Sequence, residues 1–237
     1  MRYDILYIKG RPSINGDEEL RYSLRSLERY GCYYKRIFIT GECPDFIDQR
    51  KVIYTKEQDI GCPMINHWWK VHQTIKKTDI STNFVLMYDD IFFMGVQDMT
   101  KIPYYFKGFL GNARNGGTLY QESLRNAEQW LLNKGRSTFD FELHKPIIYN
   151  RKKFLKLEKI FNPMKDETPA MAVRSIYGNL FVKYPTYQED IKIREADVRV
   201  ENLSALHSCF SVSDKAFTCH VLPWCKEHFQ TKGRYEK

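Results

Sequence analysis

The sequence predicts an α/β fold in which an open, mostly parallel sheet is flanked by helices. Three observations indicate this class. Strand-like and helix-like segments alternate through the first hundred residues, the 237-residue chain is long enough for one large domain, and an apolar strand ends on two adjacent carboxylates, Asp89 and Asp90. That strand lies in the stretch FVLMYDDIFF, residues 84–93. Because ligands bind at the carboxyl ends of strands in such sheets, the pair predicts a binding site there.

The first hundred residues have a regular order of elements. YDILYIK (Tyr3–Lys9) alternates in polarity and is rich in β-forming residues, which predicts the first strand. Asn15 followed by Glu18 resembles a capping box, and leucines then recur at helical spacing until Gly31 can stop the helix. The elements expected after this helix are strands over 35–41 and 51–54, a helix over 64–76 and a strand over 84–88.

The second half of the chain has a less regular pattern. Its expected elements are a turn-rich loop (112–117), helices (121–133 and 169–184), a strand leading into a basic amphipathic segment (141–161), and a short strand and turn (206–217). No repeat, low-complexity tract or clear linker divides the chain. We therefore expect a single domain over 1–237.

Charge and composition restrict the class of protein. Lys and Arg total 37 against 29 Asp and Glu, giving a net charge of +8. This balance favours polyanionic partners such as nucleic acid, phosphorylated sugars or anionic lipid, although a solvated basic surface explains it equally well. No apolar run approaches the ~18 residues of a membrane span, and no signal peptide is recognised. The six cysteines include no CxxC pair, so we expect a cytoplasmic protein with free thiols.

The acidic pair has two interpretations. Burying a carboxylate without a partner is costly, so Asp89 and Asp90 should each have one. Hard oxygen ligands after a buried strand suit Mg²⁺ or Mn²⁺ beside a phosphate, and the cation would neutralise a departing diphosphate. The alternative is that the two residues form a cap or turn at the end of the strand.

Six segments carry a resemblance to a known family. In order they are ELRYSLRSLERY, KRIFIT, FVLMYDDIFFMG, LHKPIIYNR, VRSIYGNLFVKY and FQTKGRYEK. Together they resemble the Stealth family of sugar-phosphate transferases and, more broadly, the GT-A nucleotide-sugar glycosyltransferases. The resemblance implies a GT-A-like (Rossmann-like) fold and a UDP-sugar or other nucleotide-diphosphate sugar as donor. It also implies a nucleotide-sugar-binding half over 1–100 and an acceptor-binding half over 101–237.

The resemblance implies roles for individual residues as well. Asp89 and Asp90 would bind the metal and the donor diphosphate, and Asp214 would be the general base for an acceptor hydroxyl unless it is a turn residue. His144 would be a base, an acceptor contact or a metal ligand, or an ordinary hydrogen-bonded histidine. Arg174 would offset diphosphate charge or form a structural ion pair. The implied donor-binding residues, each with a purely structural alternative, are Tyr7, Lys9, Arg21, Arg25, Asn66 and Lys70, together with Asp89.

The acceptor is open between DNA and a glycan. The basic balance would suit a bacteriophage enzyme that glycosylates hydroxymethylated bases in DNA, with the base flipped out and Lys and Arg on the phosphates. The residues expected at the mouth of the cleft are Arg151, Lys152, Lys153 and Lys156, with Lys232 and Arg234 in the tail. A capsule or other cell-surface polysaccharide, receiving a sugar or a sugar phosphate, is the alternative. A nuclease or a DNA-binding protein is a second alternative, but a two-metal nuclease should carry further acidic clusters.

Overall fold

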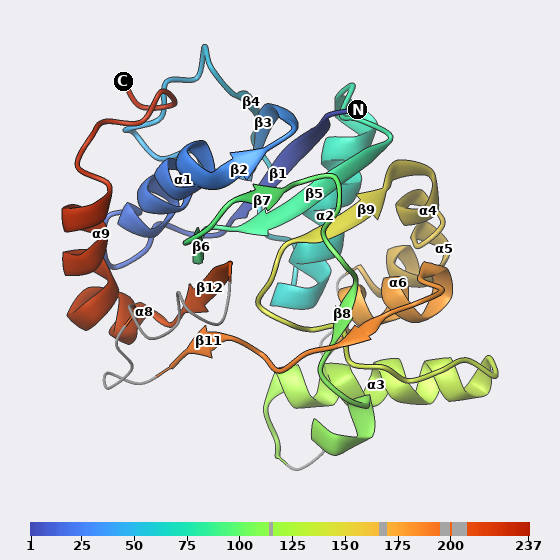
Figure 1. Ribbon diagram of the computed structural model, residues 1–237. Helices are drawn as coiled ribbons and strands as arrows, with labels where there is room; N and C mark the ends of the chain where they lie inside the picture. Colours follow the sequence, from blue (N-terminus) through green and yellow to red (C-terminus); the bar gives the residue numbers. More distant parts are fainter. Residues whose placement is uncertain (114–115, 166–169, 195–199, 201–207) are drawn as a thin grey trace.

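The computed structural model describes residues 1–113, 116–165, 170–194, 200 and 208–237. These residues form a layered α/β structure around a five-stranded sheet of order β4–β3–β1–β5–β9 (Figure 1). Strands β4, β3, β1 and β5 are parallel, and β9 is antiparallel to β5. The predicted α/β class and mostly parallel sheet are therefore confirmed. The strands are β1 (Tyr3–Lys9), β3 (Tyr34–Gly41), β4 (Ile53–Thr55), β5 (Asn83–Tyr88) and β9 (Ile147–Asn150).

The alternation of side chains along β1 divides the apolar core between the two faces of the sheet. Ile5 and Tyr7 belong to the core that contains the leucines of helix α1, whereas Leu6 belongs to the core that contains helix α2. Helix α9 contacts α1 and contributes Cys225 to the same core, whereas helices α2, α3 and α6 contribute to the second core (Figure 1). The helices are α1 (Glu18–Tyr30), α2 (Pro63–Lys77), α3 (Leu119–Asn133), α4 (Arg151–Leu155), α5 (Glu158–Phe161), α6 (Val173–Phe181) and α9 (Leu222–His228).

A small sheet brings a distant part of the chain to the end of β5. Its order is β11–β12–β6, with Lys192 beside Ser211 and Ser211 opposite Ile91. Because Ile91 follows Asp90 directly, this register sets Lys192 and Ser211 next to the acidic pair. The short strands are β2 (Gly31–Cys32), β6 (Ile91–Phe93), β7 (Gln97–Asp98), β8 (Tyr105–Phe106), β10 (Thr186–Tyr187), β11 (Lys192–Ile193) and β12 (Cys209–Val212). The short helical turns are η1 (Leu110–Ala113), η2 (Asn162–Met164), α8 (Asp214–Ala216) and η3 (Phe217–Val221).

The start of α1 differs from the prediction. The cap residue is Asp17, with a left-handed φ of 63°, and no side-chain hydrogen bond caps the helix. Asn15 donates instead to Glu19, at 2.6 Å, and the Asp17 carboxylate accepts from the backbone N–H of Ser13, at 2.8 Å. The polar side chains of this loop therefore hold one another, and the expected capping box between Asn15 and Glu18 is not formed.

Other predicted elements agree in type but differ in length. Helix α6 is shorter than the helix predicted over 169–184, of which residue 169 lies outside the described residues. Residues 114–115 of the predicted loop and residues 206–207 of the last predicted element also lie outside them. All six cysteines are described and carry free thiols. Within the described ranges, no helix is both long and apolar enough to cross a membrane.

Helix α1 anchors the carboxyl-terminal segment through a buried carboxylate. Glu236 accepts hydrogen bonds from Arg21 Nη1 at 2.7 Å, from Arg25 Nε at 2.6 Å and from the backbone N–H of Gly233 at 2.8 Å. Its side chain is only 5% exposed. The surrounding donors, led by Arg25, keep the pKa of Glu236 below its usual value although burial acts in the other direction.

The substitution Glu236→Gln is expected to lower the free energy of unfolding by about 2 kcal/mol, because two guanidinium groups lose their carboxylate partner. For a chain of this size we expect the thermal midpoint to fall by roughly 4–8 °C. Glu227→Gln, at an exposed position in α9, is the matched control and should leave the midpoint unchanged. An unchanged midpoint in Glu236→Gln would show that the tail is not anchored through this residue.

Candidate active site

A cavity of about 480 Å³ opens at the carboxyl ends of β1 and β5. Asp89 and Asp90 reach it from the end of β5, and Gly10 from the end of β1. The polar residues that line the rest of it are Asp59, Asn66, His67, Lys70, Tyr88, Tyr120, Glu142, His144, Arg174 and Lys192. The acidic pair thus lies at the edge of the sheet where parallel strands expose ligand sites.

Each carboxylate of the acidic pair has an ammonium partner. Asp89 Oδ2 lies 3.2 Å from Lys9 Nζ, and Asp90 Oδ2 lies 3.0 Å from Lys192 Nζ. Asp90 also accepts a hydrogen bond from Ser211 Oγ at 2.8 Å. Burial raises the pKa of Asp89 to about 6, although the Lys9 charge acts in the opposite direction. The cost of burying the pair is therefore offset by two lysines, and the two residues form the turn between β5 and β6 rather than a helix cap.

Lys9 and Lys70 are held by buried polar contacts next to the acidic pair, and Lys70 lines the cavity. Lys9 is 2% exposed, and its ammonium also contacts Asp17 at 2.8 Å and the carbonyl of Arg11 at 2.9 Å. Lys70 binds Asp59 at 2.6 Å and the carbonyl of Lys9 at 2.9 Å. The neighbouring backbone leaves no room for a side chain at Gly41, whose φ of 113° also favours glycine. This close approach of β3 to β1 helps to hold both lysines in place.

The acidic pair fits a divalent cation held jointly with a diphosphate. Mg²⁺ is commonly held by one or two carboxylates, with substrate phosphates and water completing its coordination. Asp89 and Asp90 supply two hard oxygen ligands at the wall of the cavity. Among the residues that the structure describes, no group of three or more His, Cys, Asp or Glu side chains could hold a metal by itself. The donor set thus suits a cation that arrives with a phosphorylated ligand better than a permanently bound one.

Arg174 presents a buried guanidinium to the same cavity. It stands in the first turn of α6, is 4% exposed, and donates from Nη2 to the carbonyl of Lys145 at 2.8 Å. Its Nε has no hydrogen-bond partner. Burial acts to lower the pKa of Arg174, but Tyr88, Tyr149 and the Glu142 carboxylate outweigh it and raise that pKa. At Gly178, further along α6, a side chain would collide with the Phe141 ring, so the helix packs closely on the segment before β9. Arg174 is therefore a fixed, buried cation with one hydrogen bond and an unpartnered Nε, which favours an anionic ligand.

Tyr88 is oriented toward the cavity by a buried histidine. Its hydroxyl lies 2.7 Å from His67 Nδ1, and the hydroxyl of Tyr149 lies 3.3 Å from His67 Nε2. Burial, with a smaller effect from Arg174, lowers the pKa of His67 to about 3. The imidazole is therefore neutral at physiological pH and holds Tyr88 beside the Arg174 guanidinium, whose carbon is 5.8 Å from the tyrosine ring centroid.

His144 forms a hydrogen-bonded pair with Asp190. His144 Nδ1 lies 2.7 Å from Asp190 Oδ2, and the backbone N–H of His144 donates to Asp190 Oδ1 at 3.0 Å. Burial acts to raise the pKa of Asp190, but the contacts with His144 and the Lys107 charge outweigh it and keep that pKa well below its usual range. An ionised Asp190 fixes the proton of the neutral imidazole on Nδ1, which leaves the lone pair on Nε2.

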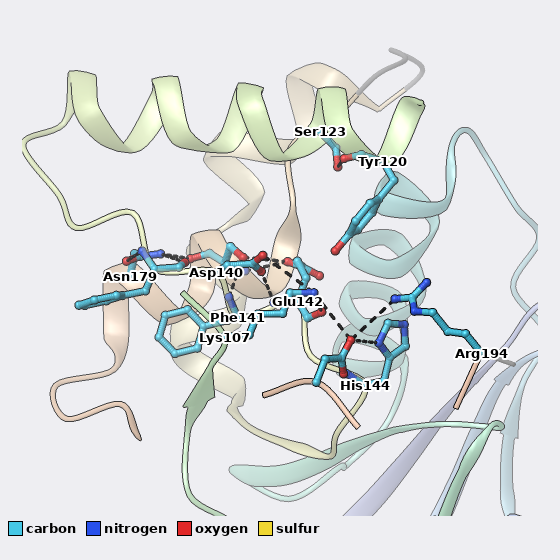
Figure 2. A network of polar contacts seen from close by, with 12 residues as sticks. Lys107, Tyr120, Ser123, Asp140, Phe141, Glu142, His144, Asn179 and Arg194 are labelled. Atoms are coloured by element: carbon cyan, nitrogen blue, oxygen red, sulfur yellow. Dashed lines mark hydrogen bonds and ion pairs between the residues drawn. The ribbon is translucent and has the colours of Figure 1, made fainter. Parts of the chain in front are cut away.

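A wider polar network supports this pair (Figure 2). Lys107 lies 3.8 Å from Asp190, donates to the carbonyl of Glu142 at 2.8 Å, and contacts Asp140 at 3.9 Å. Figure 2 shows the network beneath α3, with Tyr120 pointing from that helix toward Glu142 and His144. The Glu142 carboxylate accepts from the backbone N–H of Ser175 at 2.9 Å, so it also fixes the start of α6.

Several residues with predicted roles in donor binding or catalysis do not line the cavity, and Lys9 is one of them. Tyr7 is fully buried and its hydroxyl contacts Ser23 at 3.1 Å, and Arg21 and Arg25 bind Glu236 as described above. Asn66 does line the cavity, but its side chain holds the loop before α2 by accepting from Ile60 at 2.8 Å. Asp214 is exposed at the start of α8 and is not a lining residue. For these residues the structural alternative agrees with the contacts observed, and their functional roles stay predictions.

The position of the basic cluster requires a correction. Arg151, Lys152, Lys153 and Lys156 were expected at the mouth of the cleft. Because β9 is antiparallel to β5, pairing Asn150 with Asn83, it carries the chain away from His144 to the amino edge of the sheet. Arg151 there donates to the carbonyl of Ile75 at 3.1 Å. The cluster thus lies at the opposite edge of the sheet from Asp89 and Asp90.

The sequence interpretation missed several lining or supporting residues, among them Lys192, Asp190, Glu142 and Tyr120. Lys192 and Asp190 lie on or near β11, a two-residue strand too short to produce a periodic pattern. Glu142 directly follows Phe141 in the stretch FDFE and precedes His144 by two positions, which could have suggested it. Tyr120 is part of the first turn of α3, where a tyrosine carries no distinctive signal.

Comparison with known proteins supports the fold. No family model matches the chain, and no curated protein matches its sequence. A galactosyltransferase, LgtC, solved with donor and acceptor sugar analogues, matches with a TM-score of 0.51 and 11% identity over 96% of each chain. A glycosyltransferase involved in glycosylation of the major capsid of PBCV-1 has a TM-score of 0.44 and 12% identity, covering 96% of this chain and 99% of its own. The first match confirms the predicted GT-A-like fold.

Proposed function

We propose that the chain is a nucleotide-sugar-dependent glycosyltransferase. The observation that carries this proposal is one cavity that combines a strand-end acidic pair with the buried guanidinium of Arg174, whose Nε has no hydrogen-bond partner. A nucleotide-diphosphate sugar fits both groups, since Arg174 would donate to its diphosphate and Asp89 and Asp90 would hold a cation together with it. Residues 1–100 would form most of the nucleotide-sugar-binding half and residues 101–237 the acceptor-binding half.

In the proposed reaction, the bond between the anomeric carbon and the diphosphate breaks, and a bond from an acceptor oxygen to that carbon forms. The departing diphosphate accumulates negative charge. Arg174 is positioned to stabilise this charge without reorganisation, because it is already desolvated and held by α6. A bound Mg²⁺ or Mn²⁺ would add Lewis-acid stabilisation of the same leaving group.

The acceptor proton must go to a base in the cavity. His144 is the best-placed candidate, because Asp190 fixes the tautomer that leaves Nε2 free and His144 lines the cavity. Asp190 would then act as a positioning residue that also stabilises the protonated imidazole. Asp214, the other candidate base, lies outside the cavity lining.

We propose a hydroxyl of a glycan or glycoconjugate as the acceptor. The DNA hypothesis depended on the cluster from Arg151 to Lys156, which lies at the opposite edge of the sheet from the acidic pair. DNA bound to this cluster would lie at the amino ends of the parallel strands, whereas the cavity that would receive its hydroxyl lies at their carboxyl ends. The net charge of +8 alone does not distinguish the two acceptors.

The decisive experiment is a thermal-shift screen of nucleotide sugars with Mn²⁺, followed by product analysis. Binding to the folded chain should raise the midpoint, because a ligand at about one hundred times its Kd adds ~2.7 kcal/mol. Release of nucleoside diphosphate would support glycosyl transfer, whereas release of nucleoside monophosphate would indicate sugar-phosphate transfer instead. If no nucleotide sugar and no nucleoside diphosphate shifts the midpoint, the proposal is wrong.

The choice of base yields a further prediction. His144→Asn is expected to lower the turnover rate by about a hundredfold or more while donor binding persists, because only the proton transfer is removed. Asp190→Asn should lower the rate less and shift the pH profile, since His144 would lose the carboxylate that orients it. Asp214→Asn is the comparison, and a large loss there with normal His144→Asn turnover would assign the base to Asp214 instead.

A further inference from the structure

The two ammonium groups on the acidic pair differ in how firmly they are held. Lys9 makes three polar contacts, to Asp89, Asp17 and the carbonyl of Arg11, and its side chain is 3% exposed. Lys192 has one partner among the described residues, Asp90, and its side chain is 19% exposed. Three contacts use all the donors of an ammonium, so Lys9 is locked, whereas a single contact leaves Lys192 free to move.

Lys192 occupies the place of a cation at Asp90. Its Nζ lies 3.0 Å from Asp90 Oδ2, the same oxygen that accepts from Ser211 at 2.8 Å. A divalent ion bound by Asp90 would coordinate Oδ2 or the other carboxylate oxygen. In either position it would lie close to the Lys192 ammonium, whose charge is only partly screened by solvent. Metal binding and the Lys192–Asp90 contact therefore oppose each other in the free protein.

We propose that Lys192 is a built-in counter-ion that keeps the free protein from binding a divalent cation tightly, and that the cation binds together with the donor diphosphate. This inference rests on the proposed function, because it assumes that the cavity receives a nucleotide diphosphate. The diphosphate supplies negative charge for both the metal and the displaced ammonium, so the competition disappears when the donor is present. Lys9 keeps Asp89 balanced throughout.

The proposal has a thermodynamic consequence that can be measured without turnover. If the nucleotide relieves the competition at Asp90, it must raise the affinity for metal, and the metal must raise the affinity for nucleotide by the same factor. Removal of the Lys192 charge removes part of that coupling. In a variant without the Lys192 charge, the affinity of the nucleotide-free chain for metal therefore rises. The increase in metal affinity on adding nucleotide becomes smaller.

The experiment is Mn²⁺ titration of the full chain by electron paramagnetic resonance, which counts free Mn²⁺ directly, with and without UDP. We expect Lys192→Met to bind Mn²⁺ about tenfold more tightly than the wild type in the absence of UDP, because one adjacent positive charge is gone. With UDP present, the Mn²⁺ affinities of Lys192→Met and the wild type should differ by less than they do without UDP. Lys192→Arg retains the charge and should behave as the wild type.

Two further variants separate this effect from general electrostatics and from local damage. Lys183→Met removes one charge from an exposed lysine elsewhere and should leave Mn²⁺ affinity unchanged. Ser211→Ala removes the other contact of Asp90 without changing charge, and should not reproduce the Lys192→Met effect. Lys192→Gln provides a second neutral variant if Lys192→Met does not fold.

The outcomes distinguish the inference from the function on which it rests. If wild type binds Mn²⁺ with UDP but neither neutral variant binds Mn²⁺ alone more tightly, the counter-ion proposal is overturned and the glycosyltransferase proposal stands. An equal increase in Mn²⁺ affinity in Lys183→Met would also overturn the counter-ion proposal, because the increase would then come from net charge alone. If no folded variant binds Mn²⁺ or UDP under any condition, both proposals fail.

Discussion

Replacing Asp90 with asparagine is expected to reduce Mn²⁺-dependent turnover of the donor by about a hundredfold or more while leaving the fold intact. The substitution retains the shape of the side chain but removes a formal charge from the ligand set for a hard cation. Folding should be preserved because Lys192, the partner that loses its carboxylate, is partly exposed and can be solvated. The measurement is the initial rate of nucleotide-sugar consumption at saturating Mn²⁺, together with the thermal midpoint.

Asp89→Asn should reduce turnover to a similar extent for the same reason, although it also removes one of the three contacts of the buried Lys9. Asp45→Asn, at an exposed position, is the control for loss of one negative charge. Near-normal turnover of Asp90→Asn in Mn²⁺ would show that Asp90 is no metal ligand. The acidic pair would then have to be regarded as a structural turn held by two lysines.

Sequence patterns predicted the parallel part of the sheet because each of its strands is specified locally. Alternation in Tyr3–Lys9 and the apolar run before Asp89 are visible without knowledge of any neighbour. The parallel pairing of β1 with β3 and with β5 follows from the intervening helices α1 and α2. The same reasoning placed Asp89 and Asp90 at the carboxyl end of β5. These predictions depend on short stretches of sequence and on one topological rule.

The direction of β9 could not be predicted in this way. His144 precedes β9 and lines the cavity, so a cluster beginning seven residues later was expected nearby. Four residues of extended strand span roughly 13 Å. Because β9 pairs antiparallel with β5, the chain runs this distance away from the cavity. Strand direction in a sheet depends on how the intervening chain returns, which local patterns do not specify.

The partners of the site charges were missed for a related reason. Lys192 lies 102 positions from Asp90, and Asp190 lies 46 positions from His144, so neither pair forms a local motif. Both depend on the register of β11 with β12 and of β12 with β6, in elements of two to four residues. The sequence therefore indicated the anionic half of the site but not the lysine that balances it.

Arg174→Met is expected to separate function from stability more clearly than any other substitution. Removal of the guanidinium should lower turnover by about a hundredfold to a thousandfold, because a fixed donor at the leaving group is lost. In the free protein, however, the guanidinium is buried with one carbonyl acceptor and an unpartnered Nε. Replacing such a desolvated charge with an apolar side chain of similar length should leave the free energy of unfolding unchanged or raise it by about 1 kcal/mol.

Two measurements decide between a ligand-binding and a structural role for Arg174. Thermal unfolding of the free protein should give a midpoint at or above that of the wild type, whereas the increase produced by nucleotide sugar with Mn²⁺ should be much smaller. Arg174→Lys retains the charge without the planar fork, so it should recover part of the ligand-induced increase but little of the turnover. A lower midpoint in free Arg174→Met, with normal donor binding, would instead assign Arg174 to the structural support of α6. The buried guanidinium would then no longer indicate an anionic donor.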